Sequence, residues 1–171
     1  MVDPCDFIKE YVYPAIELYR MNRTTKHLAI HAMSQVDVLA AVLALWVAQK
    51  PALGRGEESK FREELGAREP AINLIRDAHD CHKHGGLDRK SATASDGQRP
   101  TPKTEFGFFV DHTFVGGPLT PYDVLVFVQD DRTASEVVTM LHDAMQAWGR
   151  ELGRHKMSMP PDGEYSSVDV T

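Results

Sequence analysis

Apolar residues recur every three or four positions along most of this chain, which is the spacing of helices that bury one side. The first such stretch covers residues 7–19, and Asp3 followed by Pro4 is typical of the start of a helix. A second, longer stretch follows a polar junction and ends near Gln49. The pattern predicts two N-terminal helices, of which the first is kinked or split at Pro14.

The same spacing predicts three more helices in the rest of the chain. A run of charges around Leu65 indicates a short amphipathic helix. Pro70 opens the next helix, since proline is tolerated in the first turn. For the last helix, Thr133 and Glu136 have the spacing of a capping box, and a continuous apolar stripe follows as far as Gly153.

Two stretches before the last helix are instead rich in aromatic and β-branched residues. They cover residues 106–115 and 122–129 and are separated by glycine and proline, so we expect a β-hairpin over residues 105–129. Before the hairpin, residues 88–103 are rich in Ser, Thr, Gly, Pro and charge. Because such a segment has nothing with which to build a core, we expect a flexible loop there.

The length of 171 residues fits one domain with its own core. We expect a mainly α fold, a four- to five-helix bundle with one inserted β-hairpin before the C-terminal helix. The domain covers residues 1–153, and residues 154–171 form a C-terminal tail. Residues 38–48 are apolar on every side of the second helix and therefore lie at the centre of the bundle or in a subunit interface. We expect a homodimer.

The overall charge narrows the classes of partner. The chain has 19 Lys and Arg residues and 25 Asp and Glu residues, which gives a formal net charge of −6. Such a chain has no general attraction for nucleic acids or membrane surfaces, and its sequence contains no DNA groove-binding motif. A phosphate-bearing partner must therefore be held by a local group of cations.

The cysteines and the N-terminus bear on location. Cys5 and Cys81 are isolated thiols and do not form the even, spaced framework of a secreted domain. The acidic N-terminus does not resemble an export signal. The longest uncharged run, residues 38–49, is shorter than the ~20 residues of a membrane helix. We expect a cytoplasmic protein that makes no contact with a membrane.

The candidate chemistry lies in residues 76–84, which hold three histidines, two aspartates, a cysteine, an arginine and a lysine. At about 100° per residue, His82 falls on the core-facing side of the helix. The opposite side carries the charged residues Arg76, Asp77, Asp80, Lys83 and His84. Taken singly, His82 is explained as a core histidine whose ring bonds to a carbonyl or hydroxyl. Taken singly, the charged residues are explained as a solvated face of the helix. Together, their density favours a functional site.

Arg76 and Asp77, followed by His82, resemble the signature of the HEPN superfamily (higher eukaryotes and prokaryotes nucleotide-binding). That signature is an arginine, a polar residue directly after it, and a histidine a short distance further on. Here five residues separate Arg76 from His82. The resemblance implies a helical bundle with metal-independent RNA cleavage, or binding of RNA or a nucleotide, at a dimer interface. It implies no cofactor.

A second resemblance is to a group of uncharacterised bacterial helical-bundle proteins that carry an Arg-Asp…Asn…Lys-His helix. In this chain Arg76 and Asp77 match the first pair, Lys83 and His84 match the last pair, and Asp80 replaces the asparagine. This resemblance implies His84 as the functional histidine. Because seven residues separate it from Arg76, the two resemblances leave the choice of histidine open.

These residue types suit RNA cleavage. An imidazole can accept the proton of a ribose 2′-hydroxyl near neutral pH. The guanidinium of Arg76 can hold the scissile phosphate through paired donors and stabilise the charge that develops on it. Asp77 could orient the histidine or hold the arginine. We therefore expect Arg76, Asp77, His82 and His84 to form the catalytic site.

A metal site is the first alternative. His27 and His31 are one helical turn apart and project the same way, as paired imidazole ligands of one ion do. The remaining ligands would be an imidazole and a carboxylate, namely His79 or His82 with Asp77 or Asp37. Such a set suits a divalent transition metal without choosing among Zn²⁺, Fe and Mn²⁺.

The second alternative is a non-catalytic protein that serves dimerisation or partner binding. Residues 38–48 support it because they offer a continuous apolar surface. The edge of the expected strand at residues 106–115 could also add to the sheet of a partner.

Overall fold

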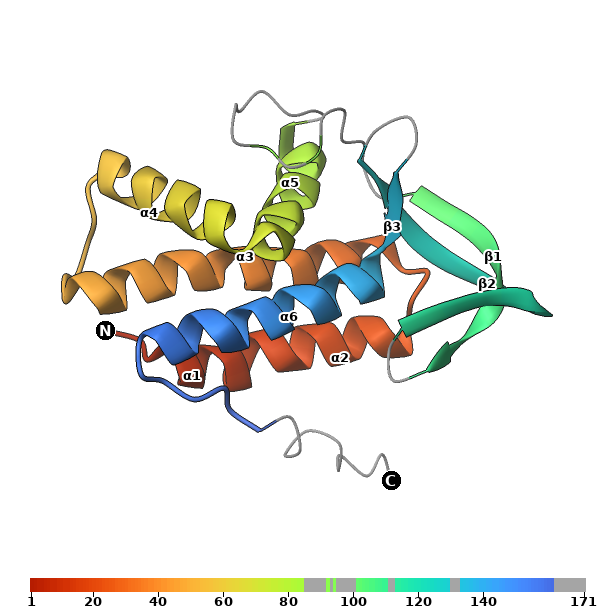
Figure 1. Ribbon diagram of the computed structural model, residues 1–171, viewed down its shortest axis with the longest axis horizontal. Coiled ribbons are helices and arrows are strands. Elements are labelled where there is room, and N and C mark those ends of the chain that lie inside the picture. Colours follow the sequence, from red (N-terminus) through yellow and green to blue (C-terminus); the bar gives the residue numbers. More distant parts are fainter. Residues whose placement is uncertain (85–91, 93, 95–100, 111–112, 130–132, 162–171) are drawn as a thin grey trace.

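The computed structural model describes residues 1–84, 92, 94, 101–110, 113–129 and 133–161. It is mainly helical, with a small antiparallel sheet inserted before the last helix (Figure 1). The fold class predicted from the sequence is therefore confirmed.

The N-terminal helical segment consists of α1 (Pro4–Phe7), a π-helical turn η1 (Ile8–Val12) and α2 (Tyr13–Met21). Asp3 caps it, since its carboxylate accepts a backbone N–H of the first turn at 2.7 Å. Pro14 lies in the first turn of α2, directly after the π turn. A proline interrupts the regular hydrogen-bond ladder one turn before it, so the predicted kink takes the form of this wider turn.

α3 (Lys26–Ala48) runs along the bundle and is followed by α4 (Arg55–Arg68) and α5 (Pro70–His84). α4 runs in the direction opposite to α3. α5 begins at the end of α4 and runs at a steep angle to it (Figure 1). Glu69 alone separates α4 from α5, and its backbone carbonyl accepts N–H groups from the first turn of α5. The start of α5 at proline agrees with the sequence prediction.

The core lies between the N-terminal segment, α3, α5 and α6 (Val137–Arg154). Its largest fully buried side chains are Trp148, Tyr19, Phe127, Ile8, Met33, Leu39 and Leu43. Trp148 and Leu141 belong to the apolar stripe predicted for the last helix. Burial of such stripes from several helices is the main favourable term that holds the bundle together.

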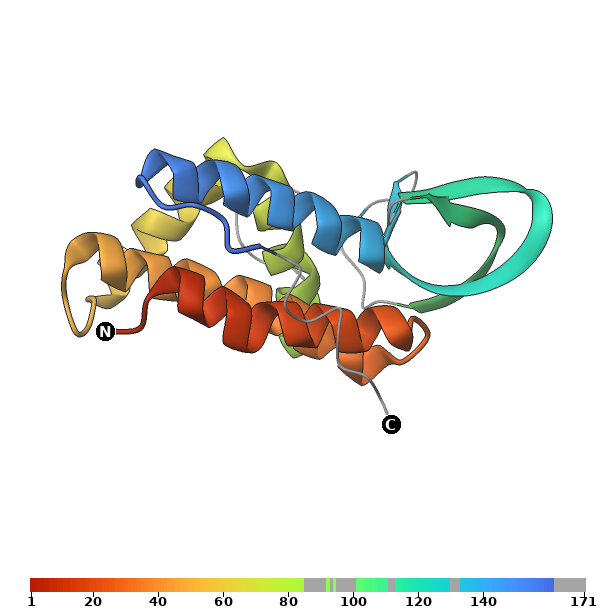
Figure 2. The same ribbon diagram turned by 90° about the horizontal axis from the view of Figure 1, so that it is seen from below.

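The sheet consists of β1 (Thr101–Val110), β2 (Thr113–Val128) and β3 (Ala134–Glu136), in the order β1-β2-β3. Figure 2 shows the β1–β2 hairpin extending from one end of the bundle. β1 begins inside the loop predicted over residues 88–103. Apart from Ala92 and Ala94, the rest of that loop lies outside the described residues.

Val110 of β1 pairs with Thr113 of β2, and residues 116–121, where the glycines and prolines predict the turn, lie within β2. The partner of β1 instead changes from Pro121 to Gly116 in a single step of the register. Such a bulge interrupts the ladder of hydrogen bonds, which is why glycine and proline are tolerated there. The predicted position of the turn is therefore wrong, because a bulge and a turn favour the same residues.

The capping box predicted for Thr133 and Glu136 is also wrong. Glu136 is itself the N-cap of α6, and its carboxylate accepts the N–H of Thr139 at 2.7 Å. Thr133 lies before β3 and accepts a backbone hydrogen bond from Gln129. The short strand thus occupies the residues that the sequence assigns to the first turn of the helix.

The described part of the predicted C-terminal tail returns to the bundle. The hydroxyl of Tyr13 donates to the carbonyl of Pro160 at 2.7 Å in a buried hydrogen bond. Met157 and Met159 pack against the core. The segment that follows α6 therefore covers the N-terminal helix.

A group of charges fastens the junction of α4 and α5 to α6. The buried carboxylate of Glu69 binds Arg150 at 2.7 Å, and that of Glu151 binds Arg68 at 2.7 Å. Arg154 binds both carboxylates. Burial alone raises the pKa of each glutamate, but the hydrogen bonds from the arginines outweigh it and lower both pKa values. These ion pairs fix the position from which α5 starts.

By length and composition alone, α3 could cross a membrane, and it is the one helix in the described part of the chain that could. Its middle carries Asp37, which is paired with Arg62 of α4 and His79 of α5. In this structure α3 is therefore a central helix of the bundle. The cytoplasmic location stays a prediction.

Candidate functional site

α5 is buried on more than one side. Ile72, Ile75, Ala78 and Cys81 form the apolar side that the periodicity predicts, and all are buried. α3, α4 and α6 all contact this helix. Its polar residues are therefore also placed among neighbours and do not simply point into water.

The charged side of α5 is not the solvated face that its sequence suggests. Asp77 is fully buried, and only 20% of the Arg76 side chain and 24% of the Asp80 side chain are exposed. Lys83 and His84, in the last turn, are exposed. The difference arises because a helical wheel places residues around one helix, whereas in the fold α4 contacts α5 and Ala94 lies against Asp77.

Asp77 binds the backbone of Ala94. One of its carboxylate oxygens accepts the backbone N–H of Ala94 at 2.8 Å, and both residues are buried. A carboxylate bonded to a backbone N–H is a charge-assisted hydrogen bond and stronger than a neutral one. Asp77 therefore has a structural role, in addition to the catalytic role that the sequence predicts.

A second carboxylate, Asp37 of α3, links three helices. One of its oxygens binds Nη1 of Arg62 on α4 at 2.7 Å, and the other lies 3.3 Å from Nδ1 of His79 on α5. Arg62 is held further by Glu58 at 2.9 Å. The side chains of Asp37, Arg62 and His79 are each between 12% and 14% exposed. This arrangement fixes the ring of His79 relative to α3.

The charge on Asp37 is stabilised by its partners. Burial raises the pKa of this carboxyl, but the hydrogen bond from His79 and the charge of Arg62 outweigh burial and leave the pKa below its ordinary value. Asp37 is therefore a carboxylate near neutral pH, able to accept a hydrogen bond from the imidazole.

The sequence predicts His79 and Asp37 only as metal ligands and does not single out Arg62. The one available signal is the position of Arg62, three residues before the buried Leu65 on the same side of α4. The pairing of Asp37 with His79 spans 42 residues of sequence, and no local pattern predicts it.

The two histidines that the sequence predicts to be catalytic, His82 and His84, have fewer hydrogen bonds among the described residues than His79 has. His82 is half-buried and His84 is exposed. Neither ring has a hydrogen-bond partner among the residues that the structure describes. Within the described part of the chain, no hydrogen bond fixes the orientation of either imidazole.

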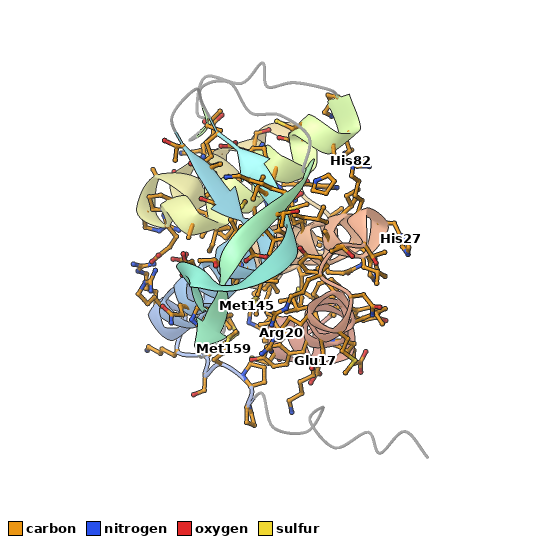
Figure 3. The ribbon with its side chains drawn as sticks, turned by 90° about the vertical axis from the view of Figure 1, so that its right-hand side faces the viewer. Glu17, Arg20, His27, His82, Met145 and Met159 are labelled. Atoms are coloured by element: carbon orange, nitrogen blue, oxygen red, sulfur yellow. The ribbon has the colours of Figure 1, made fainter. Side chains whose placement is uncertain are left out.

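Of the predicted metal ligands, His79 and Asp37 meet, but they do not form a group of three with another described ligand. His27 and His31 are exposed at the start of α3, and His79 is paired with Asp37. His27 and His82 lie apart in Figure 3. In the described part of the chain, no three His, Cys, Asp or Glu side chains form a group that could hold a metal ion. The metal site stays a prediction.

Some apolar side chains remain exposed on the outer surface of the N-terminal segment and α3. They are Tyr11, Leu18, Met21, Val38 and Val47. Two of the five, Val38 and Val47, belong to the segment that the sequence proposes as a subunit interface. The homodimer and the partner-binding alternative stay predictions.

The chain was compared with known protein families, with curated proteins and with solved structures, and none of them matches it.

Proposed function

We propose that the protein binds RNA or a nucleotide through its phosphate at the polar side of α5, and that it cleaves RNA without a metal ion. The observation that carries the proposal is the burial of the polar residues. Arg76, Asp77, His79, Asp80 and His82 are all buried or half-buried. Titratable side chains are rarely kept out of water in such numbers unless they are paired, ligated or catalytic.

The residue types favour a phosphate over other ligands. Arg76 carries a planar guanidinium, a group whose paired donors match two phosphate oxygens. Imidazoles on the following turns of the same helix can exchange a proton near neutral pH. Because the chain carries a net charge of −6, binding depends on these local cations, and we expect a short RNA footprint.

The test is cleavage of an end-labelled RNA oligonucleotide in the presence of EDTA. We expect the wild-type protein to cleave, and Arg76→Ala to reduce the rate by about 10²–10³-fold, as the loss of a donor to a developing oxyanion does. Arg76→Lys keeps the charge without the paired donors and should recover only part of the rate.

Lys60→Ala is the matched control, since Lys60 is an exposed cation on α4 whose one ion pair within the described residues is with Glu64 at 3.9 Å. It should cleave at the wild-type rate, and circular dichroism should show that each variant is folded. A wild-type protein that neither binds nor cleaves RNA, or cleavage that survives Arg76→Ala unchanged, would contradict the proposal.

A further inference from the structure

We propose that His79 is the imidazole that accepts the proton in this reaction, and that Asp37 is its positioning residue. This inference rests on the proposed function and deepens it, because the sequence places His82 or His84 in that role. It starts from His79, whose ring lies against a carboxylate of another helix.

The geometry around His79 fixes both the ring and its partner. Nδ1 of His79 lies 3.3 Å from one oxygen of Asp37, and the other oxygen of Asp37 binds Arg62 at 2.7 Å. Arg62 also donates to the backbone carbonyl of Asp37 at 3.2 Å and to Glu58 at 2.9 Å. A carboxylate held at both oxygens cannot rotate freely, so it favours the tautomer with the proton on Nδ1.

That tautomer leaves Nε2 as the basic nitrogen. Asp37 is the one hydrogen-bond partner of the His79 ring within the described residues, so the ring's second nitrogen keeps its lone pair for a ligand. A carboxylate that orients an imidazole whose second nitrogen is unprotonated is the arrangement that holds a general base in place.

His79 is also close in sequence to Arg76, the residue proposed to bind the phosphate. Arg76 precedes it by three residues on α5, and residues with this spacing are neighbours on one side of a helix. The two side chains are similarly half-buried, at 20% and 12% exposure. A phosphate held by Arg76 would therefore bring its ribose within reach of His79.

In the reaction, Nε2 of His79 takes the proton of the ribose 2′-hydroxyl. The 2′-oxygen forms a bond to phosphorus as the bond from phosphorus to the 5′-oxygen breaks. The leaving 5′-oxygen takes a proton from water or from the imidazolium, which gives a 2′,3′-cyclic phosphate and a 5′-hydroxyl. Asp37 stabilises the imidazolium in between, and Arg76 stabilises the charge on the phosphate.

The test compares His79→Ala, His82→Ala and His84→Ala in RNA cleavage with EDTA. We expect His79→Ala to lose about 10²–10⁴-fold in rate, the usual contribution of a general base. Added imidazole should restore part of that loss, which it would not do for a histidine with only a structural role. His82→Ala and His84→Ala should each lower the rate by less than His79→Ala does.

Asp37→Asn tests the positioning residue. We expect kcat to fall while KM stays near that of the wild type, because substrate binding through Arg76 is kept. Nitrogen NMR of the wild-type protein should show the proton of neutral His79 on Nδ1, and Asp37→Asn should mix the two tautomers.

The failure of this inference can be told from that of the proposed function. If the wild type cleaves RNA, and His82→Ala or His84→Ala abolishes cleavage while His79→Ala does not, the inference is overturned and the proposed function stands. If the wild type has no activity on RNA, both are overturned.

Discussion

Replacing Trp148 by alanine is expected to lower the free energy of unfolding by about 3–5 kcal/mol, the usual cost of removing a large aromatic side chain from a core. Trp148 is among the largest fully buried side chains, and it lies on α6 within the core formed with α3 and α5. Its removal leaves a cavity that the surrounding helices can fill only in part. Urea denaturation followed by circular dichroism measures the loss.

Trp148→Phe is the matched control for packing. The indole Nε1 of Trp148 has no hydrogen-bond partner among the described residues, so its loss breaks no bond. We therefore expect Trp148→Phe to cost less than half of what Trp148→Ala costs. Equal losses for the two variants would show that the indole makes a specific interaction and that packing is not its main contribution.

Replacing Asp37 by alanine is expected to cost about 3 kcal/mol, because it leaves two partners without their carboxylate. Arg62 and His79 are 13% and 12% exposed, so water can compensate only in part. Glu64→Ala removes a partner from an exposed pair on α4 and should leave the free energy of unfolding almost unchanged.

The effect of Asp37→Ala should depend on pH. Burial raises the pKa of Asp37, but its bonds to His79 and Arg62 bring the folded-state pKa below the ordinary value of about 3.9. The carboxylate therefore stabilises the fold fully above about pH 4, and this contribution is lost as the pH falls through the folded-state pKa. A loss of the same size near neutral pH and at about pH 3 would contradict this account.

The helices of the bundle could be predicted from the sequence because their signals are local. The apolar spacing, Asp3 with Pro4 and the proline that opens α5 each act within one or two turns. The turn of the hairpin and the cap of α6 could not, because glycine, proline and Glu136 are compatible with more than one local structure. Only the pairing of β2 with β1 and β3 decides between them.

The candidate site was only partly predictable for a similar reason. The density of titratable residues on α5 locates it, but burial of Asp77 and Arg76 depends on segments that are distant in sequence. Ala94 reaches Asp77 from 17 residues away, and Asp37 reaches His79 from 42 residues away. Periodicity within one helix contains no information on such partners.

The central claim is that the polar side of α5 binds the phosphate of RNA. Its most direct test is an NMR titration of the labelled wild-type protein with a short 2′-O-methyl RNA, which lacks the attacking hydroxyl and cannot be cleaved. The account predicts saturable shifts of the Arg76 side-chain Nε–H and of the His79 ring. Shifts confined to other parts of the protein, or none at millimolar RNA, would contradict it.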